Sequence, residues 1–210
     1  MEIPSYLFFA TIGVVVAVVF VYFRMDSLNL KFTDLIIYIL ICTVSALVFA
    51  RVLFVVVMFP QTDLAATNIF YYLINGGIVF YGGLLGLIIG ICIGSKVLKK
   101  DSLEVLNLIA PAIPLFHCFA RIGCLFAGCC YGVPWLWGVI IEGEDFVRFP
   151  VQAFESLCNL VIFVTIVVYN SRNHNYQYSL KIYLCCYAFC RFILEFFRGD
   201  SVLGIWFLGD

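Results

Sequence analysis

The chain has 210 residues, of which 64% are hydrophobic and only 12% charged, and its net charge is −1. A soluble domain carries about 25% charged residues, so this composition excludes an ordinary water-facing surface and fits a multi-spanning membrane protein. The charge balance also excludes a strongly basic nucleic-acid binder. Because no compositional break divides the chain, we expect a single transmembrane domain over residues 1–210.

Six apolar segments are each long enough to cross a hydrocarbon core of about 30 Å. They cover approximately 5–23, 35–59, 78–98, 105–131, 149–169 and 180–197. The first lacks the positive n-region of a signal peptide and is interpreted as a retained spanning helix. Gly199 to Asp210 is too short to span again. We therefore expect an all-α polytopic membrane protein with about six transmembrane helices.

Two regions should depart from straight helices. Pro111 and Pro114 remove backbone donors and should kink or interrupt the fourth segment. Residues 60–77 begin at Pro60 and are rich in Asn and Gly, which predicts a loop with room for an interfacial helix.

The loop charges predict an orientation. Basic residues gather in the loops 24–34, 96–104 and 170–181, whereas 60–77 has none and 132–148 has only Arg148 against three acidic residues. The positive-inside rule places the first set in the cytoplasm, so the N-terminus should face outward.

The fourth segment holds polar residues that are costly inside a membrane. In HCFARIGCLFAGCCYG, the residues His117, Arg121, Cys124 and Gly128 follow an i, i+4, i+7, i+11 spacing. That spacing predicts one helical face. Most of the ten cysteines lie in apolar runs, where packing is the default interpretation.

Further polar groups occur in other segments. Arg191, Glu195 and Arg198 follow an i, i+4, i+7 spacing, the second segment holds Arg51, and the third begins with FYGGLLG. Arginines around a cavity suit an anionic phosphate ligand, because the guanidinium fork matches phosphate oxygens. The alternative is that the arginines only pair with Glu155 and Glu195, or extend to lipid head groups.

Four motifs in order resemble the bacterial prolipoprotein diacylglyceryl transferase family over nearly the whole chain. FYGGLLG resembles the family's F-H-G-G-L-x-G, and IAPAIPLFHCFARIGCLFAGCCYG resembles I-A-P-x-x-P followed by G-R-x-G-N-F-x-N-G-E-x-x-G. FPVQAFE resembles H-P-[ST]-Q-L-Y-E, and RFILEFFRGD resembles R-x-x-x-E-F-x-R-x-P-D. The family normally has a further C-terminal span, which we expect this chain to lack.

The resemblance implies a transferase of lipoprotein biosynthesis in the bacterial cytoplasmic membrane. Such an enzyme moves the diacylglyceryl group of phosphatidylglycerol to the thiol of a lipobox cysteine in a prolipoprotein, and its site opens toward the outer leaflet. The implied partners are phosphatidylglycerol, the prolipoprotein signal-peptide region and the bilayer, with no nucleic acid and no cofactor.

The same resemblance implies site residues. Arg121, Arg191 and Glu195 match essential family residues, Tyr6 matches an N-terminal tyrosine, and Gly132 closes the signature. The substrate-binding set is predicted as Tyr6, Arg51, Gly82, Gly83, Cys124, Cys129 and Gly132.

Several positions depart from the family pattern. Tyr81 replaces a histidine, Cys124 an asparagine and Cys129 a glutamate, while Ala127 replaces a second asparagine. His117 stands where the usual motif has no histidine.

Our mechanistic hypothesis is that Arg121 and Arg191 clamp the departing phosphate, with Glu195 orienting Arg191. His117 is the candidate base, against the alternative of a packed, hydrogen-bonded histidine. Tyr81 would hold hydrogen bonds to lipid, because its reference pKa of about 10 is far from neutral.

Four interpretations remain open for Cys124, Cys129 and Cys130: packing thiols, a disulfide, a catalytic thiol and a metal site. The spacing between His117 and these cysteines matches no usual zinc pattern, so we expect no metal. For the whole chain, the alternatives are a family paralogue acting on another acceptor, or a small anion or lipid transporter. A membrane thiol–disulfide protein is disfavoured, because the C-x-x-C spacing is absent.

Overall fold

The computed structural model describes residues 3–58, 79–141, 143, 145–173 and 176–199. The side chains of Ile3, Pro4, Met58, Phe80 and Tyr81 lie outside this description, as does the predicted loop 60–77. Within the described residues the chain is mostly helical, as the composition predicts.

The chain divides into two compact units. The first contains Met1–Arg24 and Asn107–Asp210, and the second contains Met25–Leu106. The prediction of a single domain is not tested by this division.

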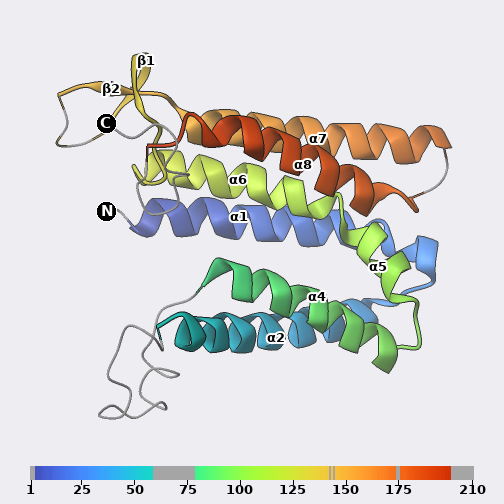
Figure 1. The fold of residues 1–210 in the computed structure, drawn as a ribbon. Coiled ribbons are helices and arrows are strands. Elements are labelled where there is room, and N and C mark those ends of the chain that lie inside the picture. Colours follow the sequence, from blue (N-terminus) through green and yellow to red (C-terminus); the bar gives the residue numbers. More distant parts are fainter. Residues whose placement is uncertain (1–2, 59–78, 142, 144, 174–175, 200–210) are drawn as a thin grey trace, which may run out of the picture. The chain divides into compact units, whose positions relative to one another are not determined.

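The first unit contains four long helices (Figure 1), in which α1 packs against α6, α6 against α7 and α7 against α8. Their bounds are α1 Ile3–Tyr22, α6 Ala112–Phe126, α7 Val151–Asn173 and α8 Ser179–Glu195. Ile162, Ile166 and Tyr183 form a buried apolar cluster between α7 and α8. One helical turn beyond this cluster, the Asn170 amide of α7 donates to Ser179 Oγ of α8 at 2.9 Å. Apolar burial and matched polar groups together fix the α7–α8 pair.

A short antiparallel hairpin lies between α6 and α7, formed by β1 Pro134–Ile140 and β2 Val147–Arg148. The sequence analysis treated 132–148 only as a loop. Aromatic residues alternate along β1, which is typical of a strand. The rings of Trp135 and Trp137 both contact the Phe149 ring, at centroid distances of 5.9 and 5.7 Å.

The second unit is built on a helix pair, α2 Phe32–Met58 and α4 Phe80–Val97, preceded by the short helix η1 Met25–Leu28. Every fourth residue of α4 from Gly82 to Gly94 is glycine, and a Cβ added at these positions would meet α2 closely. Small residues at this spacing allow two helix backbones to approach each other.

The fourth predicted segment is broken as expected. It forms α5 Ser102–Ile109 and α6, bent by 41° at the break. Pro111 is the N-cap residue of α6. The N–H of a residue at this position makes no hydrogen bond within the helix, so proline, which has no N–H, is tolerated there. The predicted single face is wrong at one residue, because α6 ends at Phe126 and Gly128 lies beyond it with a φ of 63°.

Helices are found at each of the six predicted segments, but the six-span count is not confirmed. Within the described residues, α1, α2 and α7 can cross a membrane by length and composition, and the number rises from 3 to 4 if the bent α5–α6 pair is one span. The described part of α4 is a shorter apolar helix, and α8 has 17 residues.

Candidate functional site

One face of α7 carries polar side chains although it is buried. Gln152, Glu155, Ser156 and Asn159 are each at most 7% exposed, and their i, i+3, i+4, i+7 spacing puts them on one side of the helix. The Ser156 hydroxyl donates to the Cys118 carbonyl of α6 at 3.0 Å. This face therefore directs polar groups toward α6 inside an otherwise apolar unit.

Glu155 joins two arginines from different helices. Arg121 of α6 forms an ion pair with Glu155, in which Nε lies 2.9 Å from Oε2. The angles of this contact do not meet the criteria of a hydrogen bond. Arg191 of α8 donates from Nη1 to Glu155 Oε1 at 3.1 Å. Glu155 is only 3% exposed, and burial of a carboxylate is costly unless charged partners such as these two arginines compensate for the lost water.

A second carboxylate completes this group. Arg191 Nη2 lies 2.6 Å from Glu195 Oε2, one helical turn along α8. The two arginine side chains remain 23% and 25% exposed. Within the described residues, the ion pair of Arg121 uses only Nε, so its two Nη groups have no carboxylate partner.

His117 lies one turn before Arg121 on α6. Its ring packs against the rings of Phe116 and Tyr187, at centroid distances of 5.9 and 5.6 Å. This is the environment of a packed histidine, and it sits in the same helical face as Arg121. Its role as a base stays a prediction.

The loop after α6 is tied to the elements around it. The Gln152 amide donates to the Cys129 carbonyl at 2.7 Å, and Arg148 Nη1 donates to the Gly132 carbonyl at 3.1 Å. Val133 N donates to the Phe197 carbonyl at 3.0 Å. These bonds fix the loop between the start of α7 and the end of α8.

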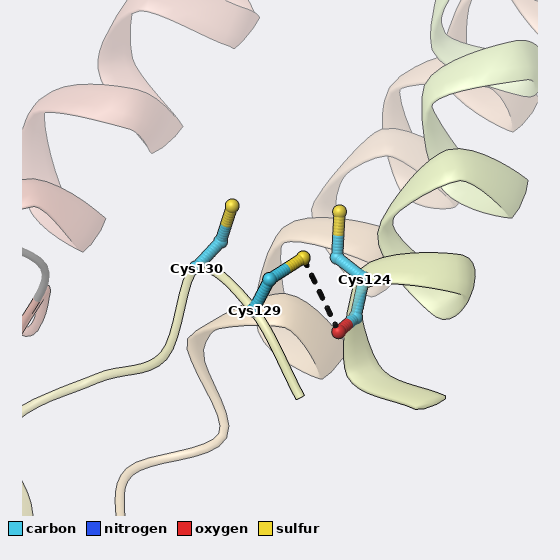
Figure 2. A group of neighbouring side chains, drawn as sticks. All are labelled: Cys124, Cys129 and Cys130. Atoms are coloured by element: carbon cyan, nitrogen blue, oxygen red, sulfur yellow. Dashed lines mark hydrogen bonds between the residues drawn. The ribbon is translucent and has the colours of Figure 1, made fainter. Parts of the chain in front are cut away.

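Three thiols gather where this loop leaves α6. The sulfur atoms of Cys124, Cys129 and Cys130 all lie within 4.8 Å of one another, and all three cysteines are free thiols (Figure 2). Hydrogen bonds from Cys124 and Cys129, followed by the charges of Arg121 and Arg198, outweigh burial and lower the pKa of Cys130. The described thiols thus form one cluster beside Arg121, without a disulfide.

Tyr6 and Gly132 are also close to this region. Tyr6 of α1 is 39% exposed, and its backbone packs against Gly123 of α6. Gly132 pairs with Arg198, and a Cβ there would collide with the Phe149 carbonyl. A close backbone approach accounts for this glycine.

The other predicted site residues belong to the second unit. Arg51 lies on α2 and is partly buried, and Tyr81, Gly82 and Gly83 lie in the first turn of α4. A Cβ on Gly82 would stand 2.5 Å from the Phe49 carbonyl, whereas one on Gly83 would meet only Ala50 Cβ at 3.9 Å. Helix packing therefore accounts for Gly82, and the binding roles of all four stay predictions.

The sequence analysis missed the central position of Glu155, which it considered only as a pairing partner. A signal was present in the QAFESLCN stretch, where four polar residues share one face of an apolar helix.

The profile of the family described as prolipoprotein diacylglyceryl transferase matches residues 1–209. The chain belongs to this family. The family is one of multi-pass membrane proteins, so the apolar helices described above are membrane helices.

Three relatives illustrate the similarity. A Clostridium perfringens protein named phosphatidylglycerol–prolipoprotein diacylglyceryl transferase 2 is 27% identical over 77% of this chain and 65% of its own length. Transferases of the same name from Clostridium tetani and Legionella pneumophila are 31% and 36% identical, over 60% and 62% of this chain and 54% and 53% of their own lengths. The chain thus spans between about half and two thirds of these prolipoprotein diacylglyceryl transferases.

Proposed function

We propose that this protein transfers a diacylglyceryl group from phosphatidylglycerol to the thiol of a lipobox cysteine in a prolipoprotein. The observation that carries the proposal is the family match over residues 1–209. The names of the relatives supply the donor lipid and the class of acceptor.

The reaction breaks one bond and forms another. The acceptor sulfur attacks the glycerol carbon that carries the phosphate ester, the C–O bond to phosphate breaks, and glycerol phosphate leaves with that electron pair. A C–S thioether forms, and the thiol proton passes to a base. Negative charge on the departing phosphate must be stabilised, which is the electrostatic task that usually contributes most to catalysis.

The pair of arginines suits this task. Arg121 and Arg191 would bind the phosphate, with Glu155 holding both guanidinium groups and Glu195 orienting Arg191. The partial exposure of both arginines and the unpaired Nη groups of Arg121, within the described residues, support a ligand at this position. His117 would take the acceptor proton, and Tyr81 would donate a hydrogen bond to the lipid.

We further propose that the protein resides in the bacterial cytoplasmic membrane with its site open to the outer leaflet. The loop charges support this orientation, because all five lysines of the chain lie in the loops assigned to the cytoplasm. A lipobox cysteine lies next to a membrane-inserted signal peptide and would reach the site from that leaflet.

The test is a reconstituted assay. The full chain is placed in proteoliposomes with head-group-labelled phosphatidylglycerol and a lipobox peptide, and thioether-linked peptide and released glycerol phosphate are measured. We expect Arg121→Lys and Arg191→Lys to lower the rate at least about 100-fold, because lysine loses the bidentate fork. Arg172→Lys, at the exposed end of α7, is the matched control and should keep wild-type activity.

The departures from the family pattern favour one second candidate, transfer to a different acceptor. Tyr81, Cys124 and Cys129 stand where the family pattern has histidine, asparagine and glutamate. Release of glycerol phosphate without modification of the lipobox peptide would support this alternative. Intact lipid that crosses the bilayer without any release would support the transporter interpretation and contradict both transfer proposals.

A further inference from the structure

The cluster of Cys124, Cys129 and Cys130 is not used by the proposed mechanism. Cys124 lies in the last turn of α6, and the other two thiols come from the loop that follows (Figure 2). Cys124 is 7% exposed and the other two are half-buried, so the cluster is largely enclosed by the protein.

Local backbone contacts hold the three side chains together. The Cys124 carbonyl accepts hydrogen bonds from the Cys129 N–H at 3.2 Å and from the Cys129 thiol at 3.7 Å. Gln152, 1% exposed, fixes the Cys129 carbonyl from α7. Cys130 has a φ of 56°, a left-handed conformation that costs a non-glycine residue about 1–2 kcal/mol. Such strain persists only where the surroundings over-determine it, which is typical of a preorganised site.

The spacing of the sulfur atoms suits a metal ion. Because the three sulfur atoms all lie within 4.8 Å of one another, there is a point between them that is at most about 2.8 Å from each. Zinc–sulfur bonds are about 2.3 Å long, so inward shifts of about 0.5 Å complete the coordination. Thiolates select soft ions such as zinc and Cu(I) over magnesium or calcium.

The charges nearby suit a thiolate complex. Three thiolates and a divalent cation carry a net charge of −1, and the cationic Arg121 lies one helical turn before Cys124 on α6, where it would partly balance that charge. A three-thiolate site also needs no histidine, so the unsuitable spacing from His117 does not count against it.

We propose that Cys124, Cys129 and Cys130 form a binding site for one soft d10 cation, Zn(II) or Cu(I). Binding releases the thiol protons, forms three metal–sulfur bonds and requires no oxidant. Zinc would keep a fourth position for a small external ligand, whereas Cu(I) would be complete with three sulfurs.

The first experiment measures binding to the full chain. The protein is purified in lipid nanodiscs, reduced with a phosphine, and titrated without oxygen with Cd(II) as a spectroscopic probe of thiolate-to-metal charge transfer. Zn(II) and Cu(I) then compete for the site in separate arms, in the presence of excess Mg²⁺. We expect one equivalent of Cd(II) per chain, and displacement by Zn(II) or Cu(I) identifies the ion that the site prefers.

Serine variants identify the ligands. Cys124→Ser, Cys129→Ser and Cys130→Ser should each weaken binding about 100-fold or more, since even the loss of a supporting residue costs 10–100-fold. Cys158→Ser is the matched control, because it removes another half-buried thiol of the same unit. Equal binding by all four variants would overturn the proposal.

A second measurement needs no substitution. Bound Zn(II) should protect Cys129 and Cys130 from alkylation in the wild-type protein, whereas the exposed Cys185 should react at an unchanged rate. Protection is read site by site by mass spectrometry. Alkylation of Cys129 and Cys130 at the same rate with and without metal would contradict the site even if the serine variants fail to fold.

Discussion

Glu155 is the residue on which the arrangement of the candidate site depends. Each of its carboxylate oxygens faces a different arginine, one from α6 and one from α8. The side chain is 3% exposed, so water cannot replace either partner. Glu155 therefore sets the distance between the two guanidinium groups that we assign to one phosphate.

Replacing Glu155 with Gln should damage both activity and stability. The substitution keeps the shape but leaves Arg121 without a carboxylate partner, and breaking a buried ion pair costs about 3–5 kcal/mol. We expect the rate of the proposed diacylglyceryl transfer to fall at least about 100-fold and the thermal unfolding midpoint in detergent to decrease. Glu104→Gln makes the same chemical change at an exposed position and should alter neither quantity. Normal transfer by Glu155→Gln would show that the arginines need no such partner.

At the scale of single residues, the sequence predicted which residues belong to the candidate site better than it predicted which of them contact each other. Arg121, Arg191 and Glu195 were predicted as one group, and the structure brings them together. Glu155 lies 34 residues after Arg121 and 36 residues before Arg191, and it forms ion pairs with both. The periodicity of a single helix does not predict such contacts between helices. The substrate-binding role of Gly132 stays a prediction, and its neighbourhood shows in addition a packing requirement that only the folded backbone reveals.

The packing of α2 against α4 depends on glycines, because a residue without a side chain lets the two helix backbones come close together. Cβ atoms at Gly82 and Gly86 would each stand 2.5 Å from a carbonyl oxygen of α2, and one at Gly90 would stand 2.9 Å from Cys42 Cα. Further along, Gly94 faces the Tyr38 ring, whose hydroxyl lies 3.0 Å from Ser95 Oγ. In a membrane, where apolar surface alone does not drive association, such close packing holds helices together.

Gly86→Ala should therefore weaken this helix pair. Its Cβ would overlap the Ser45 carbonyl, and overpacking of this kind costs about 1–3 kcal/mol. Gly83→Ala is the control, because its Cβ meets only Ala50 at 3.9 Å and alanine favours a helix by up to about 1 kcal/mol. Thermal unfolding in detergent should show a lower midpoint for Gly86→Ala and an equal or higher one for Gly83→Ala. Equal midpoints for the two variants would mean that α2 can move away at no cost.

Helix positions follow from apolar length, which explains why a helix occurs at each predicted segment. Helix ends and the short hairpin depend on other forces. The break before α6 was visible as Pro111, but the end of α6 at Phe126 was not, because Ala127 and Gly128 continue the small, apolar composition. The β1–β2 pair is stabilised by aromatic contacts to Phe149, which lies outside both strands.

At the scale of the whole molecule, the predicted orientation in the membrane depends on where the lysines lie in the sequence. The chain has five lysines, Lys31, Lys96, Lys99, Lys100 and Lys181, and all lie in loops that the positive-inside rule assigns to the cytoplasm. Of these, Lys31, Lys96, Lys99 and Lys181 are exposed, while Lys100 Nζ donates to the Leu28 carbonyl at 2.7 Å. The exposed amines therefore report which side of the membrane these loops occupy.

A membrane-impermeant amine reagent should distinguish the two orientations. In right-side-out vesicles we expect no labelling of Lys96, Lys99 or Lys181, and in inverted vesicles we expect all three to react, as read by mass spectrometry. Asp145→Lys adds an amine to an exposed position in the 132–148 loop and should show the opposite pattern, which controls for access of the reagent. Labelling of Lys96 and Lys99 from the outer side would reverse the predicted topology. It would then place the loop that carries Cys129 and Cys130 on the cytoplasmic side, away from the outer leaflet toward which we propose that the site opens.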